Sequence, residues 1–232
     1  MEGMNLMNKL KVLYEDNHVI VVLKDVNVPS QEDASRDMDL LRMVKQYVKE
    51  KYNKPGNVYI GLVHRLDRPT SGIMVFARSS KAASRLNDQI RNSELSKNYL
   101  CVVHGIIDKK EGRFEDKLKK LDNGNTIVAK DGKEAVLEYK VIDENKEEQL
   151  SLVSVKLITG RHHQIRVQFS SRGYPLYGDQ RYGTLDNKQL ALHAYKLSFI
   201  HPVKKELMEY TDFSCMKREG FNFFNVANDT IL

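Results

Sequence analysis

The sequence predicts an α+β fold, in which a mixed, mainly antiparallel β-sheet is flanked by helices and loops. Short runs of β-branched and aromatic residues recur along the chain, and stretches with helical spacing of apolar residues lie between the early runs. The polar segment 143–149, "DENKEEQ", directly joins two predicted strands, as in a β-hairpin, and this favours antiparallel pairing.

The first part of the chain predicts strands at 18–25 ("HVIVVLKD") and 72–77 ("GIMVFA"), each followed by a helix. The first helix lies in 38–52, where apolar residues recur at helical spacing, acidic residues precede the first turn and Pro55 follows the last. The second helix carries an apolar stripe that begins at Ala82, and either Ser79 or Ser80 can cap it.

The second part predicts strands at 97–105 ("KNYLCVVHG"), at 134–142 ("EAVLEYKVI") and around 153–157. The segment 134–142 alternates apolar and charged residues, which is typical of a strand with one buried face. The charged stretch 108–120 predicts a solvated loop or ribbon.

The composition favours one compact domain over residues 1–232, because 232 residues with 41% hydrophobic content can bury a substantial core. The two cysteines, Cys101 and Cys215, have no CxxC spacing, and this argues against a disulfide framework or a zinc knuckle. No apolar run is long enough to span a bilayer, so we expect a cytoplasmic protein. We also expect a monomer. The charge of +6 fits either a polyanion-binding protein or a merely basic one.

The segment "VHRLDRPTSGIMVFA", 63–77, is the first candidate for chemistry. Asp67 stands between Arg65 and Arg68 in a loop that leads into a buried strand, where a short carboxylate can be held rigidly. For an isolated Asp, however, residue type and position favour a structural role, in which the carboxylate pairs with an arginine or caps a turn.

The second candidate is the segment 159–183, which holds four arginines and two adjacent histidines. If a helix here ends at Gly173 and buries Ile165, then His162 and Arg166 share another face and can point together into a site. A surface helix with scattered charge remains the alternative. A metal site is disfavoured, because adjacent histidines diverge and no third ligand stands at a usual spacing.

Four segments in order resemble the RluA-type pseudouridine synthases, which isomerise uridine to pseudouridine in structured RNA. They are "GLVHRLDRPTSGIMVFARS", "KNYLCVVHG", "TGRHHQIRVQFSSRGYPLYGDQRYG" and "ALHAYKLSFIHP". The resemblance covers about residues 11–203, and it leaves 204–232 as a C-terminal extension of the catalytic domain.

The resemblance implies a role for five residues of this chain. Asp67 would be the catalytic aspartate, Arg166 the arginine paired with it, and Tyr99 the aromatic residue beside the target base. Arg65 would fill the space left by the extruded base, and Leu192 would line the pocket. Position alone leaves Tyr99 open to a purely structural role in the core. Further contacts to RNA phosphates are expected from Arg68, Arg161, Arg172 and Arg181.

The implied chemistry requires no metal, nucleotide or redox cofactor. Uracil leaves ribose as a delocalised anion, so one carboxylate can suffice where glycoside cleavage usually needs two acidic groups. Arg166 would keep Asp67 ionised at neutral pH. The target uridine must turn out of its stack, at a cost of a few kcal/mol, before it reaches the site.

Two departures from the family qualify the resemblance. Only about sixty residues precede "HRLD", which leaves no room for the S4-type RNA-binding domain of many relatives, so we expect the catalytic domain alone. The segment "VLKDVNVPSQED" replaces the family's usual "NKPAGLPVHP"-like segment, and this puts RNA contacts near 24–33 in doubt.

The RNA itself, ribosomal or transfer, stays open, as do two other functions. A hydrolytic nuclease would need a second carboxylate cluster for metal ions, and the sequence shows none. A non-catalytic RNA-binding protein on the same scaffold would bind RNA and change no uridine.

Overall fold

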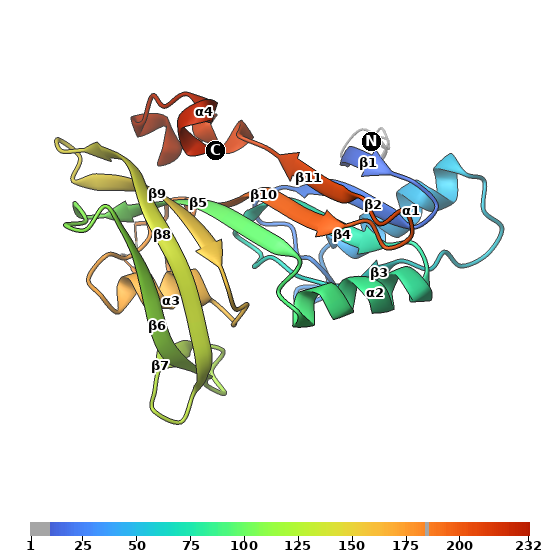
Figure 1. The fold of residues 1–232 in the computed structure, drawn as a ribbon, viewed down its shortest axis with the longest axis horizontal. Coiled ribbons are helices and arrows are strands. Elements are labelled where there is room, and N and C mark those ends of the chain that lie inside the picture. The colour runs from blue at the N-terminus through green and yellow to red at the C-terminus, as the bar shows by residue number, and fades with distance from the viewer. Residues whose placement is uncertain (1–9, 184–185) are drawn as a thin grey trace. The chain divides into compact units, whose positions relative to one another are not determined.

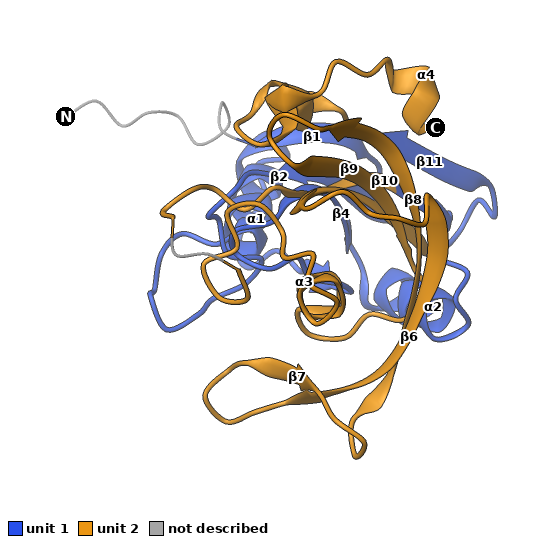
Figure 2. Cartoon of the chain, turned by 90° about the vertical axis from the view of Figure 1, so that its left-hand side faces the viewer, with its two compact units in different colours: residues 1–95, 197–211 blue, residues 96–196, 212–232 orange. Residues whose placement is uncertain are grey.

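The computed structural model describes residues 10–183 and 186–232, and this part of the chain divides into two compact units (Figure 2). Unit 1 comprises the chain up to Leu95 and residues Leu197–Thr211, and unit 2 comprises Ser96–Lys196 and Asp212–Leu232. Strands and helices occur in both units, so the predicted α+β class is confirmed (Figure 1). The domain boundaries predicted from the sequence remain a prediction.

Unit 1 is built on antiparallel strands whose middle members are almost entirely buried. The strands are β1 (Lys11–Glu15), β2 (Val19–Lys24), β3 (Gly61–Leu62), β4 (Ser71–Ala77) and β11 (Leu207–Thr211). Strand β2 pairs with β1 on one side and with β4 on the other, and β3 also pairs with β4. The end of β2 lies opposite the beginning of β4, with Lys24 across from Gly72.

Two helices complete unit 1, and both begin where the sequence predicts. Helix α1 (Leu40–Lys51) is capped by Asp39, whose side chain accepts a hydrogen bond from the backbone of Arg42. Helix α2 (Ser80–Arg91) is capped by Ser79, so the structure chooses between the two serines. Its stripe of Ala82 and Leu86 packs into the apolar core formed by β2 and β4.

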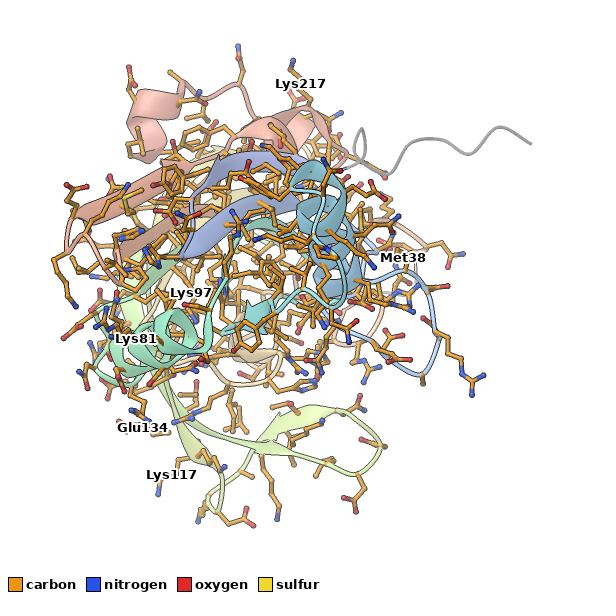
Figure 3. The ribbon with its side chains drawn as sticks, turned by 90° about the vertical axis from the view of Figure 1, so that its right-hand side faces the viewer. Met38, Lys81, Lys97, Lys117, Glu134 and Lys217 are labelled. Carbon is orange, nitrogen blue, oxygen red and sulfur yellow. The ribbon has the colours of Figure 1, made fainter. Side chains whose placement is uncertain are left out.

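Unit 2 contains a curved sheet whose strands follow the order β10, β5, β9, β8, β6, β7, with antiparallel pairing from β5 to β7. Their bounds are β5 (Ser96–His104), β6 (Glu111–Lys120), β7 (Thr126–Val128), β8 (Lys133–Asn145), β9 (Leu150–Leu157) and β10 (Leu192–Ile200), of which the last runs on into unit 1. The predicted β8–β9 hairpin is confirmed. The charged stretch 108–120 forms the exposed strand β6, whose Lys117 pairs across the ladder with Glu134 of β8 (Figure 3).

Helical segments cover both faces of the sheet in unit 2. Helix α3 (Gln164–Ser170) lies on the concave face, inside the curve of β6 and β8 (Figure 2). The C-terminal segment, with η2 (Ser214–Lys217), η3 (Phe221–Phe223) and α4 (Asn228–Ile231), packs Phe221, Phe224 and Ile231 against apolar residues of β5 and β9. Residues of the predicted C-terminal extension are therefore part of the core. No helix in the described ranges has the length and apolar character needed to cross a membrane.

Candidate active site

Asp67 lies in unit 1, in the loop 63–70 that connects β3 to β4. The side chain is half-buried, between Leu66, which is buried, and a tight turn in which the backbone N–H of Thr70 donates to the carbonyl of Asp67 at 3.0 Å. The turn therefore occupies 67–70. Strand β4 begins directly after it, at Ser71.

Two buried side chains, one at the end of β2 and one in the segment that follows it, hold this loop on either side of Asp67. The hydroxyl of Ser30 donates to the carbonyl of Leu66 at 2.7 Å and accepts from the N–H of Leu66 at 3.1 Å. The ammonium of Lys24 donates to the carbonyl of Arg68 at 3.0 Å, and also to the carbonyls of Asp25 and Val28. The backbone on both sides of Asp67 is thus tied to the same neighbouring segment.

Lys24 is completely buried, and this changes its acid–base behaviour. Burial lowers the pKa of Lys24 to about 7, and the charge of Asp67 acts in the opposite direction by favouring the ammonium form. The two side chains therefore lie within electrostatic range of each other.

The two arginines beside Asp67 have different surroundings. Arg65 is exposed. The guanidinium of Arg68 forms ion pairs with Asp33 and Asp37, and it also donates to the hydroxyl of Ser35 at 2.8 Å. An RNA phosphate would have to compete with these carboxylates for Arg68, so an RNA contact by Arg68 remains a prediction.

Tyr99, in unit 2, lies on β5 directly opposite Val155 of β9, which is itself opposite Tyr139 of β8. Residues that pair directly across a ladder point to the same face of a sheet. The ring of Tyr139 contacts Phe169 of α3, with centroids 5.8 Å apart. Tyr99, which is only 5% exposed, therefore lies on the sheet face that α3 covers.

Leu192, at the start of β10, belongs to the same face. His193 and Tyr195 point to the other face, where their side chains contact Asp212 and Phe213 of the C-terminal segment. Because side chains alternate along a strand, Leu192 points away from that segment. Within unit 2 the fold thus brings Tyr99, Leu192 and the helix that carries Arg166 to one face of the sheet.

Arg166 is buried on α3 and forms a bidentate ion pair with Asp179. Its Nε donates to Oδ2 of Asp179 at 2.8 Å, and its Nη2 donates to Oδ1 at 2.7 Å. Arg166 is 5% exposed and Asp179 is 1% exposed. A buried charge requires such a partner, and the side-on geometry fixes the plane of the guanidinium.

The adjacent histidines lie at the start of α3 and do not form the predicted helical face. His163 is the N-cap, with a left-handed backbone at φ 54°, and His162 precedes it. A helical face shared by His162 and Arg166 is therefore wrong, because the chain turns sharply between them. The imidazole of His162 bonds Thr126 at 2.9 Å, and that of His163 bonds the hydroxyl of Tyr182 at 2.7 Å.

The remaining predicted RNA contacts of unit 2 hold neighbouring backbone or carboxylate groups. Exposed Arg161 donates to the carbonyl of Glu134 at 2.7 Å, and exposed Arg181 donates to the carbonyl of Gly124 at 2.9 Å. Arg172 pairs with Asp116 and stacks over the ring of Phe114. These contacts leave their roles toward RNA as predictions.

Sequence reasoning missed Lys24, Ser30 and Asp179. A charged residue that ends a continuous apolar strand was the signal available for Lys24, and the flanking glycines of "YGDQRYG" were the signal for Asp179. Neither signal names the partner, because the partner is distant in sequence. Across residues 10–183 and 186–232, no group of three or more His, Cys, Asp or Glu side chains is arranged to hold a metal ion.

The family model described as RNA pseudouridylate synthase matches residues 18–171 of this chain. This range includes the Asp67 loop, Tyr99 and Arg166. The chain belongs to the RNA pseudouridylate synthase family. It is thus an RNA pseudouridine synthase, an isomerase that acts on RNA, in agreement with the resemblance found in the sequence.

Curated relatives agree with this assignment. The uncharacterized RNA pseudouridine synthase YhcT of Bacillus subtilis is 35% identical over 206 residues, which are 86% of this chain and 67% of that protein. The ribosomal large subunit pseudouridine synthase C of Buchnera aphidicola (subsp. Schizaphis graminum) is 31% identical over 214 residues, which are 85% of this chain and 64% of that protein. The solved structure of human RNA pseudouridylate synthase domain containing 4 has the same fold, with a TM-score of 0.77, 20% identity and coverage of 94% of this chain and 93% of that one.

Proposed function

We propose that this chain isomerises specific uridines in structured ribosomal RNA, with Asp67 as the catalytic carboxylate. The observation that carries the proposal is the Asp67 loop itself. Its "HRLD" sequence lies within the part of the chain that matches the family, and its backbone is tied down on both sides by buried Ser30 and Lys24. A catalytic carboxylate needs this kind of fixed geometry.

The proposed reaction breaks the bond between ribose C1′ and uracil N1 and forms a bond between C1′ and C5. The C5 proton is lost and N1 gains a proton, so the overall change is an isomerisation. Asp67 would act in one of three ways: by attack on C1′, by addition to C6 of the base, or by assistance in removing the C2′ proton to give a glycal. Each of them uses the ionised carboxylate.

The other proposed roles follow the family resemblance residue by residue. Arg166 would keep Asp67 ionised and oriented, Tyr99 would contact the target base, and Leu192 would line its pocket. Tyr99, Leu192 and the helix that carries Arg166 lie on one face of the unit 2 sheet. This common face supports roles for these three residues in one site. Arg65 would fill the gap left by the extruded base, and its exposed side chain is compatible with this role.

Ribosomal RNA is the preferred substrate because several relatives are named ribosomal large subunit pseudouridine synthase C. Transfer RNA is the second candidate. A net charge of +6 supports attraction to either RNA, although it does not choose between them. We further propose that the protein acts as a monomer in the cytoplasm, where its two buried free cysteines would stay reduced.

Pseudouridine mapping in ribosomal and transfer RNA, from cells with and without this gene, tests the substrate. We expect one or a few uridines of ribosomal RNA to lose modification when the gene is absent, and to regain it when the wild-type gene returns. A loss confined to transfer RNA would contradict the proposed substrate, while the assignment to the family would stand.

Asp67→Asn tests the catalytic role, because this substitution removes the charge and keeps the shape. We expect conversion of the identified RNA to be abolished, with RNA binding within about tenfold of the wild type. Asp88→Asn, which changes a half-exposed carboxylate on α2, is the matched control and should retain activity. Full activity of Asp67→Asn would refute the mechanism, and RNA binding by the wild type with no modified uridine would favour a non-catalytic RNA-binding protein.

A further inference from the structure

We propose that Asp179 and Tyr182 are positioning residues that set the orientation of Arg166 for catalysis. This inference rests on the proposed role of Arg166 and adds two residues to it. All the contacts that support it lie within unit 2, between α3 and the residue before it, the loop 176–183 and the first residue of β7.

Asp179 fixes one edge of the Arg166 guanidinium. The bonds at 2.8 and 2.7 Å use Nε and one hydrogen of Nη2. A guanidinium carries five N–H hydrogens in one plane, and its end edge carries the second hydrogen of Nη2 and one hydrogen of Nη1. Asp179 bonds the side edge, so the geometry of the group allows a second carboxylate to bond the adjacent end edge.

Asp179 is itself held rigidly, so it can transmit a fixed orientation. Its Oδ1 accepts the backbone N–H groups of Arg181 at 2.9 Å and of Tyr182 at 3.1 Å. The side chain of Asp179 is fully buried, and that of Arg166 is 6% exposed. Solvent screening of this pair is weak, and its hydrogen bonds are directional.

Tyr182 supports the guanidinium from a second direction. The centre of the Arg166 guanidinium lies 5.1 Å from the centroid of the Tyr182 ring, which is a cation–π contact. The hydroxyl of Tyr182 accepts the backbone N–H of Thr126 at 2.8 Å and bonds Nδ1 of His163 at 2.7 Å. The ring under Arg166 is thus anchored to β7 and to the start of α3.

His163 contributes no competing charge to this arrangement. Burial lowers the pKa of His163 to about 2, and the positive charge of Arg166 acts in the same direction. The imidazole therefore stays neutral in the range where the enzyme would act. Arg166 is the cation that contacts the Tyr182 ring.

A purely structural ion pair between Arg166 and Asp179 is the competing explanation. Loss of one partner in a buried pair destabilises a protein in either case, so stability alone does not separate the two explanations. The pH dependence of turnover does. If Asp179 orients Arg166 toward the reactive carboxylate, a misplaced Arg166 lets that carboxylate take up a proton at a higher pH than in the wild type. The acid limb of the profile, where kcat falls as the pH is lowered, then moves to higher pH.

The experiment measures kcat, KM and the acid limb of the kcat profile for the full chain, on the RNA identified by mapping. Asp179→Asn keeps the shape and removes the charge, Tyr182→Phe removes only the hydroxyl, and Arg166→Lys tests the underlying role. We expect kcat to fall about 10- to 100-fold in Asp179→Asn and by a smaller factor in Tyr182→Phe, with KM within about threefold. In both variants the acid limb should move to higher pH, as in Arg166→Lys.

Glu138→Gln is the matched control, because Glu138 pairs with an arginine, Arg113, in the same unit. Its acid limb should stay at the wild-type pH.

If Arg166→Lys lowers kcat but Asp179→Asn and Tyr182→Phe leave kcat and the acid limb unchanged, the positioning role is refuted and the proposed function survives. If Arg166→Lys is fully active, the geometry of the guanidinium does not matter and the positioning role is refuted, while the proposed function, which Asp67→Asn tests, survives. If Asp179→Asn does not fold, unchanged kcat in Tyr182→Phe overturns the proposal and a reduced kcat with a shifted acid limb supports it.

Discussion

Lys24 is a charged residue at the end of an otherwise apolar strand, and its three hydrogen bonds all go to backbone carbonyls. One of these carbonyls belongs to Arg68, the residue after Asp67. The family's usual segment at this place is replaced in the sequence, yet the fold retains a rigid support for the Asp67 loop. The buried ammonium of Lys24 provides part of that support, so its loss should weaken the Asp67 loop.

Lys24→Met should lower the free energy of unfolding by about 1–3 kcal/mol, because it leaves three carbonyl groups without their donor. Lys81→Met changes an exposed lysine on α2 and should have little effect (Figure 3). Urea denaturation of both variants at neutral pH measures the difference. Equal stability of the two variants would show that Lys24 does not support the loop.

The pH dependence of stability provides a second measurement on Lys24. Its pKa is about 7 in the folded state and 10.5 when unperturbed, so between these values the unfolded chain binds more protons than the folded chain. Wild-type stability should therefore gain a positive contribution as pH rises from about 7 toward 10, and Lys24→Met should lack this contribution. Denaturation curves across this range test the sign, and identical slopes for the two proteins would contradict it.

At the scale of the element, capping and side-chain periodicity account for most of the helices and strands. Apolar spacing predicted both helices of unit 1, and alternation predicted β8, because these signals are local in the sequence. The start of α3 was not predictable in this way. Its N-cap is a histidine in a left-handed conformation with no side-chain cap bond, and contacts to Tyr182 hold it there.

Helix α2 allows a sharp test of capping, because two adjacent serines stand at its start. Ser79→Ala removes the hydroxyl that accepts the N–H of Ala82, and it should cost about 1 kcal/mol of stability. Ser80 lies inside the first turn and is exposed, so Ser80→Ala should change stability by less than about 0.5 kcal/mol. Urea denaturation of the two variants compares them directly, and a larger effect at Ser80 would contradict the assigned cap.

At the scale of the whole molecule, the chain forms two compact units, each with its own apolar core. Unit 2 depends on residues near the C-terminus, since Phe221, Phe224 and Ile231 belong to its main core cluster. The sequence resemblance ends before this segment. The packing in the structure therefore shows the role of this segment in the fold, and no family motif predicted it.

Phe221→Ala should destabilise the protein by about 3–5 kcal/mol, because Phe221 is 1% exposed and its ring would leave a cavity in the core of unit 2. Leu232→Ala, at a position 63% exposed, is the control and should be nearly neutral. Thermal unfolding followed by circular dichroism measures both. A Phe221→Ala variant as stable as the control would show that the C-terminal segment is dispensable for this core.

The sequence by itself determined the α+β class, most elements and the family, because periodicity, capping residues and short motifs are written in consecutive residues. Only the tertiary structure decided which partners hold the buried charges. Lys24 meets a carbonyl 44 residues away, and Arg166 meets Asp179 13 residues away. A buried charge requires a partner, but this requirement does not identify the residue that provides it. The partner depends on how strands and loops that are distant in sequence pack together in space.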